Sequence, residues 1–212
     1  MTNGSASFVI LWMLATALGV SMSHLAADLV WFGVSSRWLF PLVPFGGATL
    51  GVLAGVLQWL VLQRRVRRSE SWMLATAAGW AGSWAVGSTA AMVIAAPGGD
   101  LLFFLAMACG TPVVGLAQRR LLREWSSRAD AWLVPSAAGW IALLGVEVFG
   151  ARWLDSISAL ASRLVERISG YQPSSTVGAS LLGGLLLGAI TGVAMARLLE
   201  APGRTGPLSV TQ

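Results

Sequence analysis

Six stretches of about 20 predominantly apolar residues run through the chain and constrain its fold more than any other feature. An α-helix of that length spans the hydrocarbon core of a lipid bilayer. Only 11% of the 212 residues are charged, too few to cover a water-facing surface. The sequence therefore predicts an all-α, polytopic membrane bundle in a single domain over residues 1–212. Its six transmembrane helices are expected near residues 8–31, 41–62, 72–95, 101–121, 131–153 and 176–199.

Short motifs recur at a constant interval, called here the repeat period, which is the distance in sequence from Trp12 to Trp72. The first helix of each predicted pair carries a Trp followed by a Gly: Trp12 and Gly19, Trp72 and Gly79, Trp132 and Gly139. The second carries a Gly followed by a polar residue: Gly55 and Gln58, Gly115 and Gln118, Gly188 and Thr191. A fixed period indicates repeated structural units. We therefore expect three tandem two-helix repeats, at about residues 8–65, 69–124 and 129–200, around a pseudo-threefold axis.

The third repeat contains an insertion. Gly115 follows Gly55 by one repeat period, whereas the interval from Gly115 to Gly188 is longer, so the last hairpin contains extra residues. Over residues 155–170, apolar residues recur at helical spacing and polar residues occupy the other face. This pattern predicts an amphipathic helix in the membrane interface; a soluble cap on the loops is the alternative. The tail, residues 201–212, is expected to be flexible.

The fourteen basic residues are all arginines, and they are unequally distributed. Ten fall in segments 63–68 and 119–128 and near the C-terminus, and four fall on the other predicted side. Because cytoplasmic loops are enriched in Arg, both termini are predicted to be cytoplasmic. Trp12, Trp72 and Trp132 are then expected at the cytoplasmic interface, where amphipathic indoles are favoured.

The composition also excludes some functions. Without Lys, neither a Schiff base nor a phosphate-loop lysine can form. The net charge of +5 comes from arginines at helix ends, so we expect the lipid bilayer and no nucleic acid as partner. The sequence lacks the nucleophile-elbow, zinc-protease and phosphate-loop motifs. It therefore predicts no enzymatic activity.

Small residues recur at every fourth position on two predicted helices. They are Gly47, Gly51 and Gly55 on one, and Ser180, Gly184, Gly188, Gly192 and Ala196 on the other. Such stripes let helix backbones approach closely in membranes. We expect Gly184 and Gly188 to face another helix of the same chain at close backbone distance, with the helix over 41–62 as the expected partner, and Leu187 to point away from that contact, toward lipid. The alternative is that the stripe faces lipid or binds a separate subunit.

Two motifs lie close together: Gly51-x-x-x-Gly55-x-x-Gln58-Trp59 and Trp72-x-Leu74-Ala75-Thr76-Ala77-x-Gly79-Trp80. Their sequence resembles a group of uncharacterised bacterial multi-pass membrane proteins. The resemblance covers about residues 12–140 and is fainter afterwards, where Thr191 replaces Gln. It implies a multi-pass protein of the bacterial cytoplasmic (inner) membrane and adds no activity.

Three ionisable residues within predicted spans are candidate functional groups, because a charge there costs about 2.5–3.5 kcal/mol on insertion scales. His24 and Asp28 share one face of the first helix. They could form a proton relay or a ligand contact, or simply a satisfied pair near the outer interface. Glu147 is alone on the fifth helix, and it is expected to meet either Arg152 or the His24–Asp28 face.

Two glutamines are the other polar candidates within the predicted spans. Gln58 and Gln118 are expected to hydrogen-bond neighbouring helices, because they recur at matching positions. No cofactor or metal is predicted, although His24 could serve as axial ligand to a tetrapyrrole metal.

Together, these features favour an accessory or scaffold subunit that packs against other membrane helices or a second copy. The alternative is a small transporter or channel that uses His24, Asp28 and Glu147. A second alternative is a pigment- or cofactor-binding membrane subunit.

Overall fold

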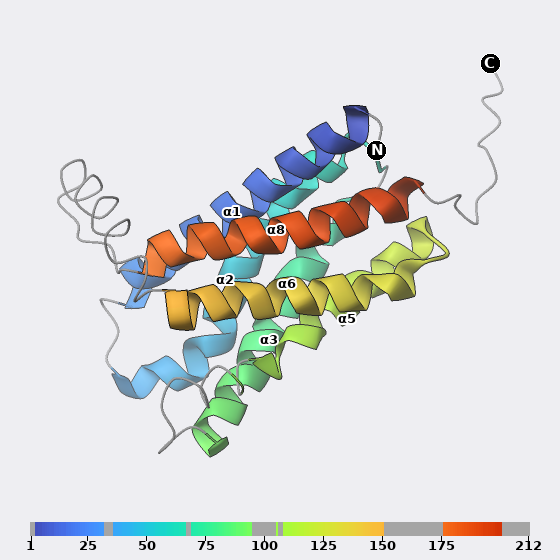
Figure 1. Cartoon of the computed structure of the whole chain (residues 1–212). Helices are drawn as coiled ribbons and strands as arrows, with labels where there is room; N and C mark the ends of the chain where they lie inside the picture. Colours follow the sequence, from blue (N-terminus) through green and yellow to red (C-terminus); the bar gives the residue numbers. More distant parts are fainter. Residues whose placement is uncertain are drawn as a thin grey trace.

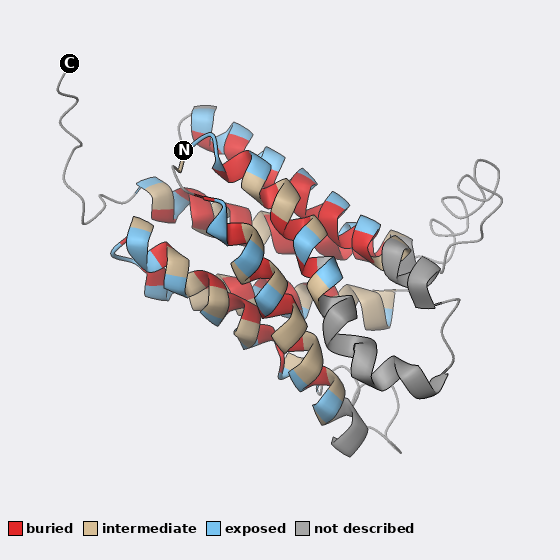
Figure 2. Cartoon of the chain, turned by 180° about the vertical axis from the view of Figure 1, so that it is seen from behind, coloured by how far each residue is buried: buried red, intermediate tan, exposed pale blue. Residues whose placement is uncertain are grey.

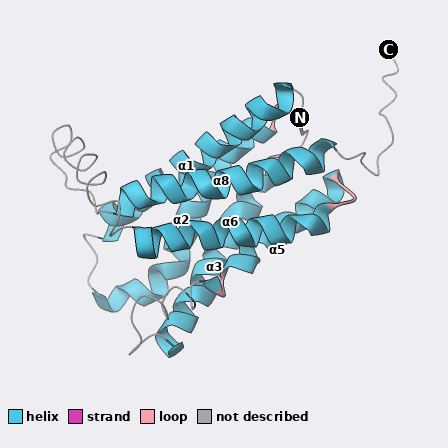
Figure 3. Cartoon of the chain, in the orientation of Figure 1, coloured by secondary structure: helices cyan, strands magenta, loops and turns pink. Residues whose placement is uncertain are grey.

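The computed structural model describes residues 3–31, 36–66, 69–94, 105, 108–150 and 176–200. All secondary structure in these residues is helical, as predicted (Figure 3). The α-helices are α1 (Asn3–Trp31), α2 (Ser36–Leu62), α3 (Ser71–Ile94), α5 (Thr111–Trp125), α6 (Leu133–Gly145) and α8 (Thr176–Glu200). A 3₁₀ turn, Ala129–Trp132, precedes α6, and a π turn, Val146–Gly150, follows it.

The helices close into a ring. Each packs against its neighbour in the order α1, α2, α3, α5, α6 and α8, and α8 returns to contact α1 (Figure 1). The start of α1 and the end of α8 lie at the same end of the bundle, where Ser5 hydrogen-bonds to Glu200. The first and last helices of the chain are therefore direct neighbours.

Among the described residues, three segments are long and apolar enough to cross a membrane: Gly4–Leu25, Ala129–Gly150 and Gly178–Glu200. Gly51–Leu62 is apolar but shorter. The fourth predicted span began near residue 101, whereas α5 begins at Thr111, with Pro112 in its first turn. Proline is tolerated there because the first N–H groups of a helix have no intrahelical partner. Residues 101–104 lie outside the described part of the chain, as do the predicted insertion at 155–170 and the tail at 201–212.

Glycines allow the two helices of each sequential pair to approach closely. A Cβ at Gly19 of α1 would lie 2.5 Å from the Cα of Ala54 in α2. The same contact recurs one repeat period later, where a Cβ at Gly79 would lie 2.8 Å from the Cα of Val114. At Gly139 of α6, a Cβ would meet Leu187 of α8. A side chain at Gly19 or Gly79 would meet backbone and push the neighbouring helices apart, whereas at Gly139 it would first displace the flexible side chain of Leu187.

The small-residue stripe of α8 faces α1, and the prediction that it faces α2 was wrong. A Cβ at Gly184 would lie 2.7 Å from the Cα of Ala17, and one at Gly188 2.7 Å from the Cα of Met13. The stripe of α2 instead packs on α3, since a Cβ at Gly51 would lie 2.6 Å from the Cα of Ala77. A ring gives each helix two different neighbours, so two similar stripes need not face each other.

Large apolar side chains are exposed on every α-helix. Figure 2 shows exposed positions along the outside of the bundle and buried positions along the inside. Large exposed apolar residues are Ile10, Leu14, Leu18, Met22, Val52, Leu60, Leu74, Val86, Leu116, Val134, Ile141, Leu181, Leu182 and Leu186. Leu74 and Val134, which are one repeat period apart, are both 75% exposed. The buried side chains include hydroxyls and amides, among them Thr16, Thr76, Gln58 and Gln118.

Candidate functional site

Three buried tryptophans close one end of the bundle. The rings of Trp12, Trp72 and Trp132 are almost fully inaccessible, and successive pairs meet edge to face with centroids 5.7 and 6.0 Å apart. This arrangement is favoured because the positive edge of one indole meets the negative face of the next. The sequence predicted these indoles as interface anchors. The structure turns them inward, where they form part of the core with Leu62, Leu122 and Met195.

Gln58 links three helices. Its Nε2 donates to Thr16 Oγ1 on α1 at 3.0 Å, and its Oε1 accepts from Trp72 Nε1 on α3 at 3.0 Å. An indole N–H can only donate, so the amide must present its oxygen to Trp72 and its nitrogen to the hydroxyl. Both polar ends of the buried amide are thereby satisfied.

The same arrangement returns one repeat period later. Gln118 on α5 donates to Thr76 at 3.1 Å and accepts from Trp132 Nε1 at 3.2 Å. In the third position Thr191 replaces the glutamine. It accepts from Trp12 Nε1 at 3.0 Å and donates to the carbonyl of Leu187 at 2.7 Å. Each indole of this layer therefore donates to a polar side chain on a neighbouring helix.

A narrow cavity lies inside this ring of polar groups. Its lining includes Thr16, Gln58, Thr76, Gln118 and Thr191. Its volume is about 20 Å³, which accommodates about one water molecule. Trp12, Trp80, Trp132 and Trp140 also line it. This cavity is therefore lined by polar and apolar side chains together and is too small for a solute.

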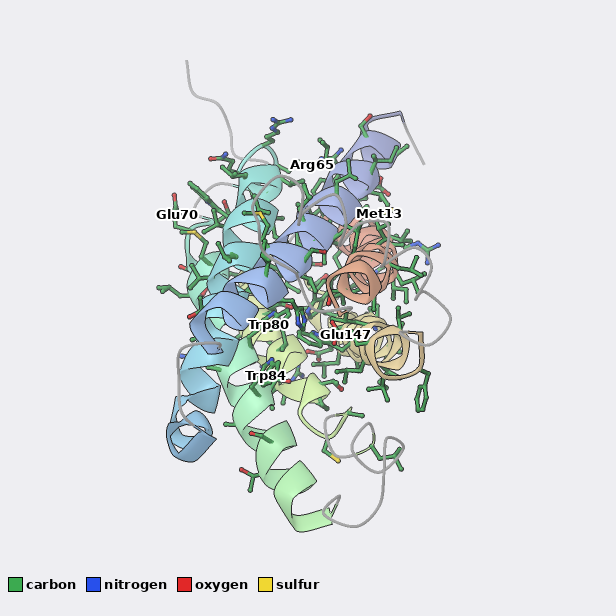
Figure 4. All side chains as sticks on the ribbon, turned by 90° about the vertical axis from the view of Figure 1, so that its left-hand side faces the viewer. Met13, Arg65, Glu70, Trp80, Trp84 and Glu147 are labelled. Atoms are coloured by element: carbon green, nitrogen blue, oxygen red, sulfur yellow. The ribbon has the colours of Figure 1, made fainter. Side chains whose placement is uncertain are left out.

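Trp80 and Trp140 separate this cavity from a second one. Their rings meet edge to face with centroids 4.3 Å apart, and both residues line both cavities. The second cavity also has a volume of about 20 Å³, and Trp84, Ser83, His24 and Glu147 contribute to its walls. Figure 4 shows Trp80, Trp84 and Glu147 around the same region of the bundle.

The structure brings His24 and Glu147 together across the bundle. His24 Nε2 on α1 lies 3.0 Å from Glu147 Oε1, and Ser180 of α8 donates to the same oxygen at 3.0 Å. The side chains are only 18% and 15% exposed, so little water competes for these contacts. Glu147 lies in the π turn after α6, and π turns occur frequently at functional sites. Glu147 was expected to meet either Arg152 or the His24–Asp28 face, and the structure places it against His24.

Some predicted positions lie outside the described residues or side chains. They are Asp28, Gly47 and Arg152. Leu187 was predicted to point away from the contacts of the α8 stripe. It is 5% exposed and faces Gly139 and the cavity on the axis, because α8 packs on α6 as well as on α1.

Several partners were missed by sequence reasoning. Thr16 and Thr76 are one repeat period apart, so their position one turn after each Trp could have indicated the glutamine contacts. Ser180 was assigned only to the packing stripe. Asp130 was not considered, yet it accepts from Arg119 at 2.6 Å and from Arg123 at 3.3 Å. No sequence signal paired Asp130 with these arginines.

Comparison with known proteins adds no assignment. No protein-family model matches the chain, and no match is found among curated proteins or solved structures. Within the described residues, no three His, Cys, Asp or Glu side chains are grouped so that they could hold a metal ion.

Proposed function

We propose that this chain is an integral membrane protein of six spans, located in the cytoplasmic membrane of a bacterium. The main support is that large apolar side chains are exposed on the outside of every α-helix, while hydroxyl and amide side chains are buried within the bundle. Monomeric soluble proteins rarely expose large continuous apolar surfaces, whereas lipid tails accept them. The bacterial location rests on the sequence resemblance.

We further propose that the six helices are three copies of one helical hairpin. The burial pattern of residues 71–80 is identical to that of residues 131–140. The glutamine contacts and the glycine contacts of the first hairpin recur in the second at the repeat period. The corresponding contacts of α8 occur at a longer offset, which is the interval from Gly115 to Gly188.

Both termini are proposed to be cytoplasmic. In the bundle, the arginine-bearing ends of α2 and α5 lie beside the start of α1 and the end of α8, since Phe8, Leu62, Leu122 and Leu198 share one core cluster. The positive-inside rule then assigns this end to the cytoplasm.

Single cysteines introduced at Ala6, which is exposed near the start of α1, and at Gly98, in a variant without Cys109, test this topology. A membrane-impermeant thiol reagent added to intact cells is expected to label the position-98 variant only. Labelling of both positions from outside would contradict the proposed orientation. Labelling of both only after lysis would contradict the outer location of position 98.

We infer that the protein is a non-enzymatic accessory or scaffold subunit. The observation that carries this proposal is that the core amides of Gln58 and Gln118 each donate one hydrogen bond and accept another between neighbouring helical segments. The cavity beside them holds about one water, so it supports neither a substrate site nor an open path. The exposed apolar sides of the helices remain available for lateral packing.

Extraction in a membrane-solubilising polymer tests this role without removing lipid neighbours. The tagged protein, whose own mass is 22.2 kDa, is expected to leave the membrane with a second copy or another membrane protein in constant stoichiometry. Paired polar substitutions at exposed apolar positions of one helix, such as Leu182 and Leu186, should release that partner. Isolation as a single copy under all conditions would contradict the scaffold role.

The transporter alternative is favoured by one observation, the contact between His24 and Glu147. Buried ionisable groups within membrane helices often belong to proton or ion pathways. If the transporter alternative is right, liposomes containing the purified protein should conduct protons or a solute, and the Glu147→Gln substitution should abolish this flux. The scaffold proposal requires no flux above that of empty liposomes. A pigment-binding role would need a His24 nitrogen to be released from its present contacts.

A further inference from the structure

A crevice of about 150 Å³ opens between α1 and the end of α2. It is lined by Gly4, Ser7, Phe8, Leu11, Val61, Arg64 and Arg65. Arg65 is held in place, because its guanidinium lies 4.9 Å from the centre of the Phe8 ring and donates to the carbonyl of Gly4. One wall is therefore cationic and the other is apolar.

The two arginine-rich segments at this end of the bundle differ in how their charge is neutralised. Arg119 and Arg123 of α5 both contact Asp130, which follows the helix. Arg64 makes no ion pair or hydrogen bond with the described residues, and none of their carboxylates forms an ion pair with Arg65. Glu70 occupies the position one repeat period before Asp130, but Figure 4 shows it away from Arg65. The charge in the crevice is thus available to an external anion.

The apolar wall continues onto the outside of the bundle. Leu11, Leu14 and Leu18 are exposed on α1 and share one face, because they follow one another at helical spacing. A ligand that places an anion between Arg64 and Arg65 could extend a hydrocarbon chain along this face. Guanidinium groups suit phosphate because they present several N–H donors in one plane.

We propose that this crevice binds the phosphate of an anionic phospholipid, with one acyl chain along Leu11, Leu14 and Leu18. The proposal rests on the membrane location proposed above. Basic pockets between helices on the cytoplasmic side are a known setting for acidic lipid head groups. The lipid would neutralise Arg64 as Asp130 neutralises Arg119, and would bridge α1 to α2.

Native mass spectrometry of the full chain in detergent tests the site, with equimolar phosphatidylglycerol and phosphatidylcholine. We expect preferential retention of phosphatidylglycerol. Arg64→Gln should weaken that retention about fivefold, the factor expected for one arginine near an anionic lipid. Arg64 is chosen because its loss breaks no contact within the described residues. Arg120→Gln is the control, since it removes an exposed charge from the other arginine-rich segment at the same end.

Three outcomes would overturn the proposal: equal retention of the two lipids, an equal loss in Arg120→Gln, or displacement of the lipid by inorganic phosphate alone. The last would indicate a simple anion site. Sedimentation of cell membranes, followed by carbonate extraction, tests the membrane location separately. A chain that stays in the membrane without lipid preference would contradict only the lipid site. A chain released by carbonate would contradict the proposed location itself.

Discussion

Replacing Trp72 by alanine is expected to destabilise the bundle by about 3–5 kcal/mol, the usual effect of removing a fully buried Trp. Trp72 contacts Trp12 on one side and Trp132 on the other, and it donates to Gln58. The substitution therefore opens a cavity where three helices meet and leaves the Gln58 oxygen without its donor. For a chain of this length, the melting temperature should fall by roughly 10 °C, measured by thermal unfolding in detergent.

A matched pair of milder variants separates the hydrogen bond from the packing. Trp72→Phe keeps an aromatic ring but removes the N–H donor, which should cost about 1–2 kcal/mol. Trp59→Phe makes the same chemical change at a buried N–H that has no partner among the described residues. It should change stability by less than about 0.5 kcal/mol, because no hydrogen bond is lost. Equal effects in the two variants would show that the Trp72–Gln58 bond contributes nothing specific.

Replacing Gly188 by leucine is expected to force α8 away from α1. A Cβ at this position would lie 2.7 Å from the Cα of Met13 and 3.1 Å from the Cβ of Thr16. Backbone atoms cannot move aside as a flexible side chain can, so the helices must separate. Overpacking of this kind costs about 1–3 kcal/mol or more. Thermal unfolding of the purified variant measures the loss.

Leu186→Phe serves as the control for added bulk on the same helix. Leu186 is exposed on the outside of the bundle, so the larger ring meets no helix of the same chain. We expect its stability to match that of the unmodified protein. If Gly188→Leu left stability unchanged and only abolished partner binding in a pull-down, the stripe would belong to an intermolecular interface. That result would contradict the packing of α8 on α1.

Helix positions could be predicted from the sequence because they depend on local properties. The C-terminal ends of α1, α2, α3 and α8 lie within one residue of the predicted limits, because apolar runs end there. The starts agree less well: α1 begins at Asn3 and α2 at Ser36, before the predicted starts near 8 and 41. The repeat period was also visible in the sequence, because Trp, Gly and Gln positions recur along the chain. It indicated which residues occupy corresponding positions, although it could not say what they contact.

The direction of each side chain was decided only by the tertiary structure. The helical period relates residues on one helix to each other, but it does not state which face meets which neighbour. Trp12, Trp72 and Trp132 could have faced lipid at the interface, and the structure turns them toward the axis. Gly188 packs against α1 because closure of the ring places α8 beside α1. The contact of His24 with Glu147 likewise joins residues that are far apart in the sequence, which only the closed ring makes neighbours.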